Sequence, residues 1–139
     1  MESVLSEREV NQYSPLTLAF LGDSVYELLV RDKMVLRGNM PASKLHSAKI
    51  KIVCAEFQSA ALDLIADELT EKEKDIVRRG RNATGNTVPK HSTAADYRKA
   101  TALESLFGFL HLVGEKERLE QLFHKIWREQ AEQFLMKEV

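Results

Sequence analysis

The sequence predicts an all-α protein that forms a single domain. Apolar residues recur at intervals of three and four along most of the 139 residues, a spacing that places them on one face of a helix. Proline occurs only at positions 15, 41 and 89, so long helices are seldom interrupted. No segment shows the strict alternation of apolar and polar residues that is typical of half-buried strands. These three observations together indicate a helical fold.

The first long helix is expected to begin at Ser14-Pro15 and to continue to about Leu36. Serine is a favourable N-cap, and proline fits the first helical position because the N–H that it lacks would have no partner there. An apolar stripe runs along this segment: Leu18, Leu21, Val25, Leu28 and Leu29. The stripe keeps its phase across Gly22, so we expect one continuous helix. The alternative is a first helix that ends at Gly22 and a second that is capped by Ser24 and Glu27.

The middle of the chain is expected to hold two more helical segments. Arg37-Gly38-Asn39 is typical of a helix end, and Pro41 of a new start. Helical spacing then covers about residues 42–67, with room for a break. Thr70 is followed three positions later by Glu73, the pattern of a capping box, which predicts a helix from there to about Arg79.

Residues 80–93 are expected to form a loop, because they hold two glycines, two asparagines, a proline and three threonines. Two helices follow, over about residues 94–113 and 116–136. The first should turn Leu103, Leu106, Phe107 and Leu110 inward. The second should bury Leu119, Leu122, Phe123, Ile126 and Trp127.

Composition fits one globular domain over residues 1–139, with 44% hydrophobic and 29% charged residues. One cysteine rules out an intrachain disulfide, which suits a cytoplasmic protein. The N-terminus has no apolar core of a signal peptide, and no apolar run approaches the roughly 20 residues that cross a bilayer. We therefore expect a cytoplasmic protein without a membrane anchor.

Charge is balanced overall but uneven along the chain. The net charge is −1, yet the segment from Arg78 to His91 contains four cations and no acid. A polyanion would have to bind to such a local patch rather than to the whole surface. The patch residues that we expect to contact a polyanion are Arg78, Arg79, Arg81, Asn82 and Lys90.

Two acids stand in strongly apolar helical segments, each with a glycine close by. Asp23 follows Gly22, and Glu104 lies four residues before Gly108. A buried carboxylate needs a partner, and a hard cation such as Mg²⁺, which prefers oxygen ligands, would satisfy both acids. The alternative is that Asp23 caps a helix and Glu104 lies on the polar side of its own.

Both segments resemble the ribonuclease III family. Phe20-Leu21-Gly22-Asp23-Ser24-Val25-Tyr26-Glu27-Leu28 is similar to the family's signature helix, and Thr101-Ala102-Leu103-Glu104-Ser105-Leu106-Phe107-Gly108 is similar to its second acidic segment. Two of the family's four acids are absent, since Ala19 and Thr101 stand in their places. In residues 79–90, and in not including the family's double-stranded-RNA-binding domain, the sequence resembles the Mini-ribonuclease III branch.

The resemblance implies an all-helical endoribonuclease domain that hydrolyses double-stranded RNA with Mg²⁺. Asp23 and Glu104 would be both catalytic residues and metal ligands. The partners that it implies are precursor 23S ribosomal RNA of the large subunit, a second copy of the chain in a homodimer, and a ribosomal protein or ribosome precursor. The alternative is a non-catalytic RNA-binding or ribosome-associated module on the same fold, motivated by Ala19 and Thr101.

Overall fold

The computed structural model describes residues 5–83, 90 and 92–137. These residues form helices and no strand, which confirms the predicted fold class. The helices are α1 (Glu7–Val10), α2 (Pro15–Arg37), α3 (Ala42–Val53), α4 (Ala55–Ile65), α5 (Glu71–Ala83), α6 (Ala94–Leu112), α7 (Lys116–Ile126) and α8 (Glu132–Lys137). A 3₁₀ turn, η1 (Ala66–Glu68), follows α4, and a π-helical turn, η2 (Trp127–Ala131), joins α7 to α8.

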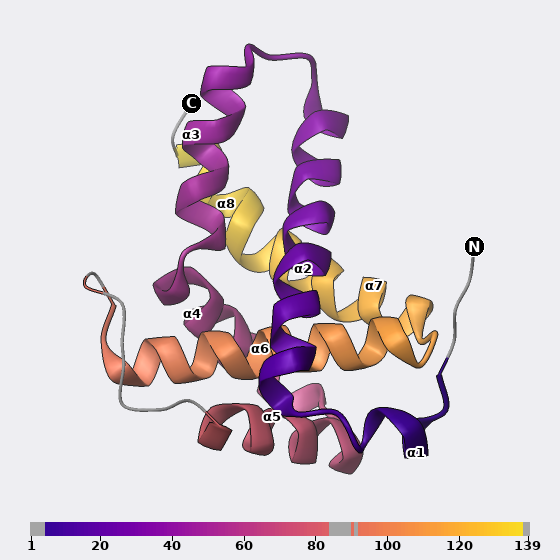
Figure 1. Ribbon diagram of the computed structural model, residues 1–139. Coiled ribbons are helices and arrows are strands. Elements are labelled where there is room, and N and C mark those ends of the chain that lie inside the picture. Colours follow the sequence, from indigo (N-terminus) through magenta and orange to yellow (C-terminus); the bar gives the residue numbers. More distant parts are fainter. Residues whose placement is uncertain (1–4, 84–89, 91, 138–139) are drawn as a thin grey trace.

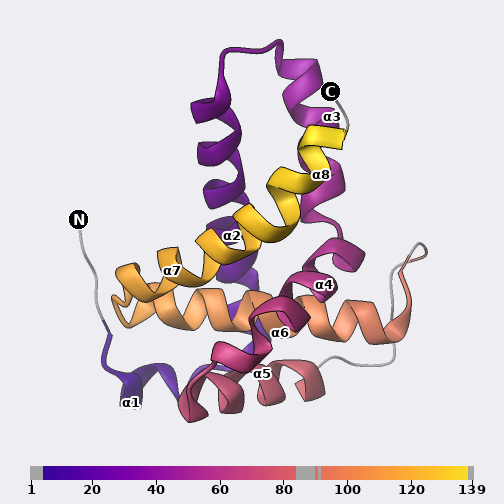
Figure 2. The same ribbon diagram turned by 180° about the vertical axis from the view of Figure 1, so that it is seen from behind.

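Helix α6 is the centre of the molecule. It contacts α2, α4, α5 and α7, so neighbours surround it on several sides. Figure 1 shows α2 crossing α6 and turning into α3, while α5 runs along α6 on the side away from this hairpin. Figure 2, the view from the opposite side, shows α7 and α8 passing in front of the hairpin. The sequence predicted that α6 would bury one apolar side. The surrounding helices instead bury nearly its whole circumference.

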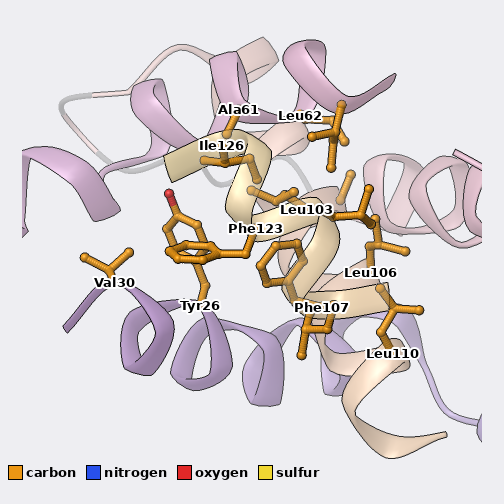
Figure 3. Packing of buried hydrophobic residues seen from close by; sticks show 14 of the residues in the cluster. Tyr26, Val30, Ala61, Leu62, Leu103, Leu106, Phe107, Leu110, Phe123 and Ile126 are labelled. Atoms are coloured by element: carbon orange, nitrogen blue, oxygen red, sulfur yellow. The ribbon is translucent and has the colours of Figure 1, made fainter. Parts of the chain in front are cut away.

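Aromatic side chains from three helices meet in the core (Figure 3). The ring of Tyr26 packs edge-on against Phe107 and Phe123, with centroid distances of 5.7 and 5.8 Å. Such pairs add about 0.5–1.5 kcal/mol to the burial itself. The hydroxyl of Tyr26 donates a hydrogen bond of 3.2 Å to the carbonyl oxygen of Ile52. Tyr26 thus joins α2 to α3, α6 and α7.

The buried face of α2 differs from the predicted stripe. The residues that it buries include Leu18, Gly22, Tyr26, Val30 and Met34, which follow each other at intervals of four. Leu28 was expected to face inward, but it is 61% exposed. The prediction was wrong here because it gave weight only to aliphatic side chains, whereas the contact with α6 is made through a glycine and a tyrosine.

Most helix ends lie where local chemistry predicts them. The hydroxyl of Ser14 accepts a hydrogen bond from the backbone N–H of Thr17, and α2 continues through Gly22 without a break. Gly38 ends this helix with φ at 153°. The capping box of Thr70 and Glu73 forms as predicted, with reciprocal bonds of 2.9 and 3.1 Å.

The structure locates one break that the sequence left open and corrects one expected connection. The helical segment over residues 42–67 does contain a break, at Cys54, whose extended backbone separates α3 from α4. The expected loop at 80–93 starts later, because α5 continues to Ala83 and includes Arg81 and Asn82. A Cβ on Gly80 would lie 2.7 Å from the hydroxyl of Ser105, so packing against α6 overrides the low helix propensity of this glycine. Residues 84–89 and 91 lie outside the described residues.

Candidate active site

The site is built where α2 and α6 cross in backbone contact. A Cβ on Gly22 would lie 1.6 Å from the carbonyl oxygen of Glu104, and one on Gly108 would lie 2.0 Å from the carbonyl oxygen of Leu18. Only glycine permits this approach at both positions. The hydroxyl of Ser105 reinforces the crossing, since it lies 2.9 Å from the carbonyl oxygen of Pro15 at the start of α2.

The crossing brings Asp23 and Glu104 together. Asp23 directly follows Gly22 in α2 and is exposed. Glu104 comes one turn before Gly108 in α6. Between Ala100 and Leu110 every residue of α6 is buried except Glu104, which is half-buried. Glu104 is therefore the point at which the central helix of the core reaches the surface, beside Asp23.

The electrostatics confirm that the two carboxyl groups interact. Burial, then a hydrogen bond with Asp23 and the negative charge of Asp23, raise the pKa of Glu104 from 4.5 to about 8. The side chain of Gln58 acts in the opposite direction and favours the ionised form. With a pKa of about 8, Glu104 is largely protonated at neutral pH. Such a pair releases the proton when a cation supplies the missing positive charge.

Tyr26 lies close to this pair but stays neutral. Burial raises its pKa above the usual value of 10, with smaller contributions from the charges of Cys54 and Glu104. Its hydroxyl is already used in the bond to Ile52. Tyr26 therefore supports the site by packing and takes no part in proton transfer near neutral pH.

The two positions at which the sequence departs from the four-acid pattern are packed inside. Ala19 and Thr101 are both buried. The hydroxyl of Thr101 donates to the carbonyl oxygen of Tyr97, one turn earlier in α6. Neither residue presents a free oxygen ligand to the acidic pair.

Glu27, one turn beyond Asp23 on α2, is held by cations instead. Its carboxylate lies 3.0 Å from Arg31 and 3.3 Å from Lys49 on α3. The pair with Lys49 connects the two helices of the hairpin, whereas the pair with Arg31 lies within α2. They assign to Glu27 a structural role.

The acidic pair fits a divalent cation that keeps much of its water. Within residues 5–83, 90 and 92–137, no three His, Cys, Asp or Glu side chains gather into a metal-binding group. Mg²⁺ commonly takes one or two protein carboxylates and completes its octahedron with water and substrate phosphate oxygens. Asp23, which is exposed, and Glu104, which is half-buried beside it, suit this kind of binding.

The predicted polyanion contacts lie near the C-terminal end of α5, and they differ in availability. Arg78 is paired with Asp75 at 2.6 Å, whereas Arg79 is half-buried. Arg81, Asn82 and Lys90 are exposed. Gly80, in the same turn as Arg79 and Arg81, contacts α6 at Ser105, the neighbour of Glu104. The end of α5 is therefore packed against the helix that carries Glu104.

Sequence reasoning missed a second basic surface on the hairpin of α2 and α3. From Lys33 to Ala55 the chain has five cations and no acid, a signal of the same kind as that of residues 78–91. A groove of about 840 Å³ is lined by Arg37, Lys44 and Lys51 among smaller and apolar residues, and a groove of about 330 Å³ by Arg31, His46 and Lys49. Neither groove is lined by an acid. We name residues 31–51 the basic hairpin.

Comparison with known proteins identifies relatives of the chain. The family model of the Ribonuclease III domain matches residues 16–115. The chain is 47% identical over 119 residues to the Mini-ribonuclease 3 of Thermoanaerobacter sp. (strain X514), with 86% of this chain and 84% of that protein covered. It is 44% identical over 108 residues to the Mini-ribonuclease 3 of Symbiobacterium thermophilum, with 78% and 83% covered.

A solved structure shares the fold. The crystal structure of a Fusobacterium nucleatum protein superposes with a TM-score of 0.80 at 31% sequence identity, over 91% of this chain and 97% of that one.

Among the described helices, none is both long and apolar enough to cross a membrane.

Proposed function

The chain belongs to the ribonuclease III domain family, and we propose that it is a Mg²⁺-dependent endoribonuclease that cleaves double-stranded RNA. The observation that carries this proposal is the contact of Asp23 with Glu104 where α2 crosses α6. The names of the relatives support the same activity. We place the enzyme in the cytoplasm, where its substrate is precursor 23S ribosomal RNA and where a ribosomal protein or ribosome precursor assists it.

In this mechanism the protein holds the cation through Asp23 and Glu104. When bound, Mg²⁺ supplies a Lewis acid that polarises the scissile phosphate and activates water for hydrolysis. Glu104, whose pKa is about 8, would lose its proton when it binds the cation. The two carboxylates are held rigidly because the glycine crossing fixes the backbones that carry them. The products are a 5′-phosphate and a 3′-hydroxyl.

A homodimer would supply the two sites that a duplex requires. Phe20 is 83% exposed on α2, and Leu16 and Leu28 are exposed on the same helix, four residues before it and eight after. Phe20 therefore differs from Tyr26 and Phe107, which are buried in the core. An exposed apolar strip of this kind is typical of a subunit interface.

Duplex RNA would be bound through its phosphates and 2′-hydroxyls, because A-form RNA presents a wide and shallow minor groove. We assign these contacts to the end of α5 with Lys90, and to the basic hairpin. Each cation that neutralises a phosphate releases a counterion and makes binding salt-dependent.

A cleavage assay tests the function directly. The protein is incubated with a long RNA duplex and with precursor ribosomal RNA, in Mg²⁺ or in EDTA, beside Asp23→Asn. We expect fragments only with Mg²⁺ and the parent protein, with RNA binding retained in the variant. Full activity of Asp23→Asn would refute the assignment of the site. Binding of both RNAs without cleavage would favour the alternative, a non-catalytic RNA-binding module.

A further inference from the structure

One buried polar side chain beside the acidic pair, Gln58, has a donor that makes no hydrogen bond of ordinary geometry. Gln58 on α4 is 2% exposed. Its amide nitrogen Nε2 has no hydrogen-bond partner in the part of the chain that the structure describes. An unsatisfied buried donor costs about 1–3 kcal/mol, so its presence needs a reason.

Three other buried polar residues have hydrogen-bond partners within the fold. Glu73 bonds with Arg118 and Thr70, and the hydroxyls of Thr101 and Ser105 bond with backbone carbonyl oxygens. These groups stabilise the packing of α5, α6 and α7. Gln58 does not follow this pattern, because its donor is unused.

The place of Gln58 suggests what the donor is for. Helix α4 packs against α6, and the side chain of Gln58 is close enough to the carboxyl group of Glu104 to interact with it. This interaction is attractive toward the carboxylate, yet no hydrogen bond of ordinary geometry forms. The donor thus lies within a small side-chain movement of Glu104.

We propose that Gln58 is a positioning residue of the metal site, whose amide N–H donates to the carboxylate of Glu104 when that carboxylate binds the divalent cation. The bond would occupy one oxygen of Glu104 and direct the other toward the cation beside Asp23. This inference rests on the proposed metal-dependent function. It gives a physical account of how a site with only two acids can be ordered, since an outer hydrogen bond fixes the direction of a ligand.

The alternative is that Gln58 only fills space in the core. In that case a side chain of similar size without a donor would serve equally well, and the protein would become more stable because a buried unsatisfied amide is removed. Stability alone therefore does not separate the two accounts. Metal affinity does, because removal of an outer-shell partner typically weakens metal binding by about 10- to 100-fold.

The test compares Gln58→Met with the parent by titration calorimetry, with Mn²⁺ and with Mg²⁺, in the absence of RNA. Methionine keeps the length of the side chain and removes the donor. Ser59→Ala is the matched control, because Ser59 is a buried polar neighbour on the same helix. Gln58→Leu serves as a second donor-free variant if Gln58→Met does not fold.

We expect the metal dissociation constant of Gln58→Met to rise about tenfold or more, while Ser59→Ala binds metal like the parent. RNA binding in EDTA should be unchanged, and saturating Mg²⁺ should restore most of the cleavage rate. Equal metal affinity in parent and variant would overturn the role of Gln58 and leave the proposed function intact. A parent protein that neither binds metal nor cleaves RNA would overturn both.

Discussion

The raised pKa of Glu104 predicts an unusual dependence of stability on pH. The pKa of Glu104 is raised from 4.5 to about 8 in the folded protein, by burial first and by Asp23 second. The folded state therefore binds this proton more tightly than the unfolded state does. The resulting stabilisation is fully present below pH 4.5 and is lost as the pH rises through about 8.

The variant Glu104→Gln isolates this effect, because glutamine resembles the protonated acid and does not titrate. Each pKa unit corresponds to about 1.4 kcal/mol, so the shift sets an upper limit of about 5 kcal/mol. Because Glu104 keeps contact with solvent, which screens the charge, we expect about half of this limit, roughly 2–3 kcal/mol. In EDTA the variant should be more stable than the parent by this amount above pH 8 and equally stable near pH 4.

Thermal unfolding followed by circular dichroism measures the difference. For a domain of this size, 2–3 kcal/mol corresponds to roughly 10 °C in Tm. Other titrating groups are common to both proteins and cancel in the comparison. Excess Mg²⁺ should reduce the difference, since the cation stabilises only the protein that binds it. A difference in Tm that stays constant from pH 4 to pH 9 would show that Glu104 is not buried beside Asp23, and would refute the reasoning.

Three further predictions concern the crossing, the dimer and the RNA contacts. Gly22→Ala should destabilise the protein by about 3 kcal/mol or more in urea unfolding, because the added Cβ would overlap the carbonyl oxygen of Glu104. The control Ser24→Ala, on the same helix, should change the free energy of unfolding by less than about 0.5 kcal/mol. Phe20→Asp should sediment as a monomer at concentrations at which the parent is a dimer, because it places a charge in the exposed apolar strip. A variant that remains dimeric would show that the interface lies elsewhere. Two variants test the RNA contacts: one replaces Arg79, Arg81 and Lys90 by glutamine, and the other replaces Arg37 and Lys44. Each should lower the slope of log affinity against log salt concentration by about one for each phosphate that is no longer neutralised. An unchanged slope would exclude that surface from RNA binding.

Local chemistry made much of the fold predictable. The caps at Ser14 and Thr70 and the stop at Gly38 are formed by side chains and backbone within a few residues, so the sequence alone contains their partners. The end of α5 was not predictable in this way. Gly80 has low helix propensity, and it is helical because α6 approaches it closely.

The site could be predicted only in part, for a similar reason. Asp23 and Glu104 were recognisable as acids in apolar segments, and the structure brings them together. Gln58 gave no such signal, because one amide in an apolar helix is ordinary until its missing partner is known. Phe20 is a different case: the sequence shows that it is apolar, but not that this chain leaves it uncovered.

The glycine crossing also explains why acids of such different exposure can form one site. Asp23 lies on the surface of α2, whereas Glu104 belongs to the buried central helix. Side chains at the contact would separate the helices and leave Glu104 either buried alone, at a high energetic cost, or turned away from Asp23. With Gly22 and Gly108 at the contact, the two backbones touch and the carboxyl groups meet at the edge of the core. The same geometry partly desolvates Glu104 and leaves Asp23 exposed to solvent, so the proposed cation would reach the pair from the side of Asp23.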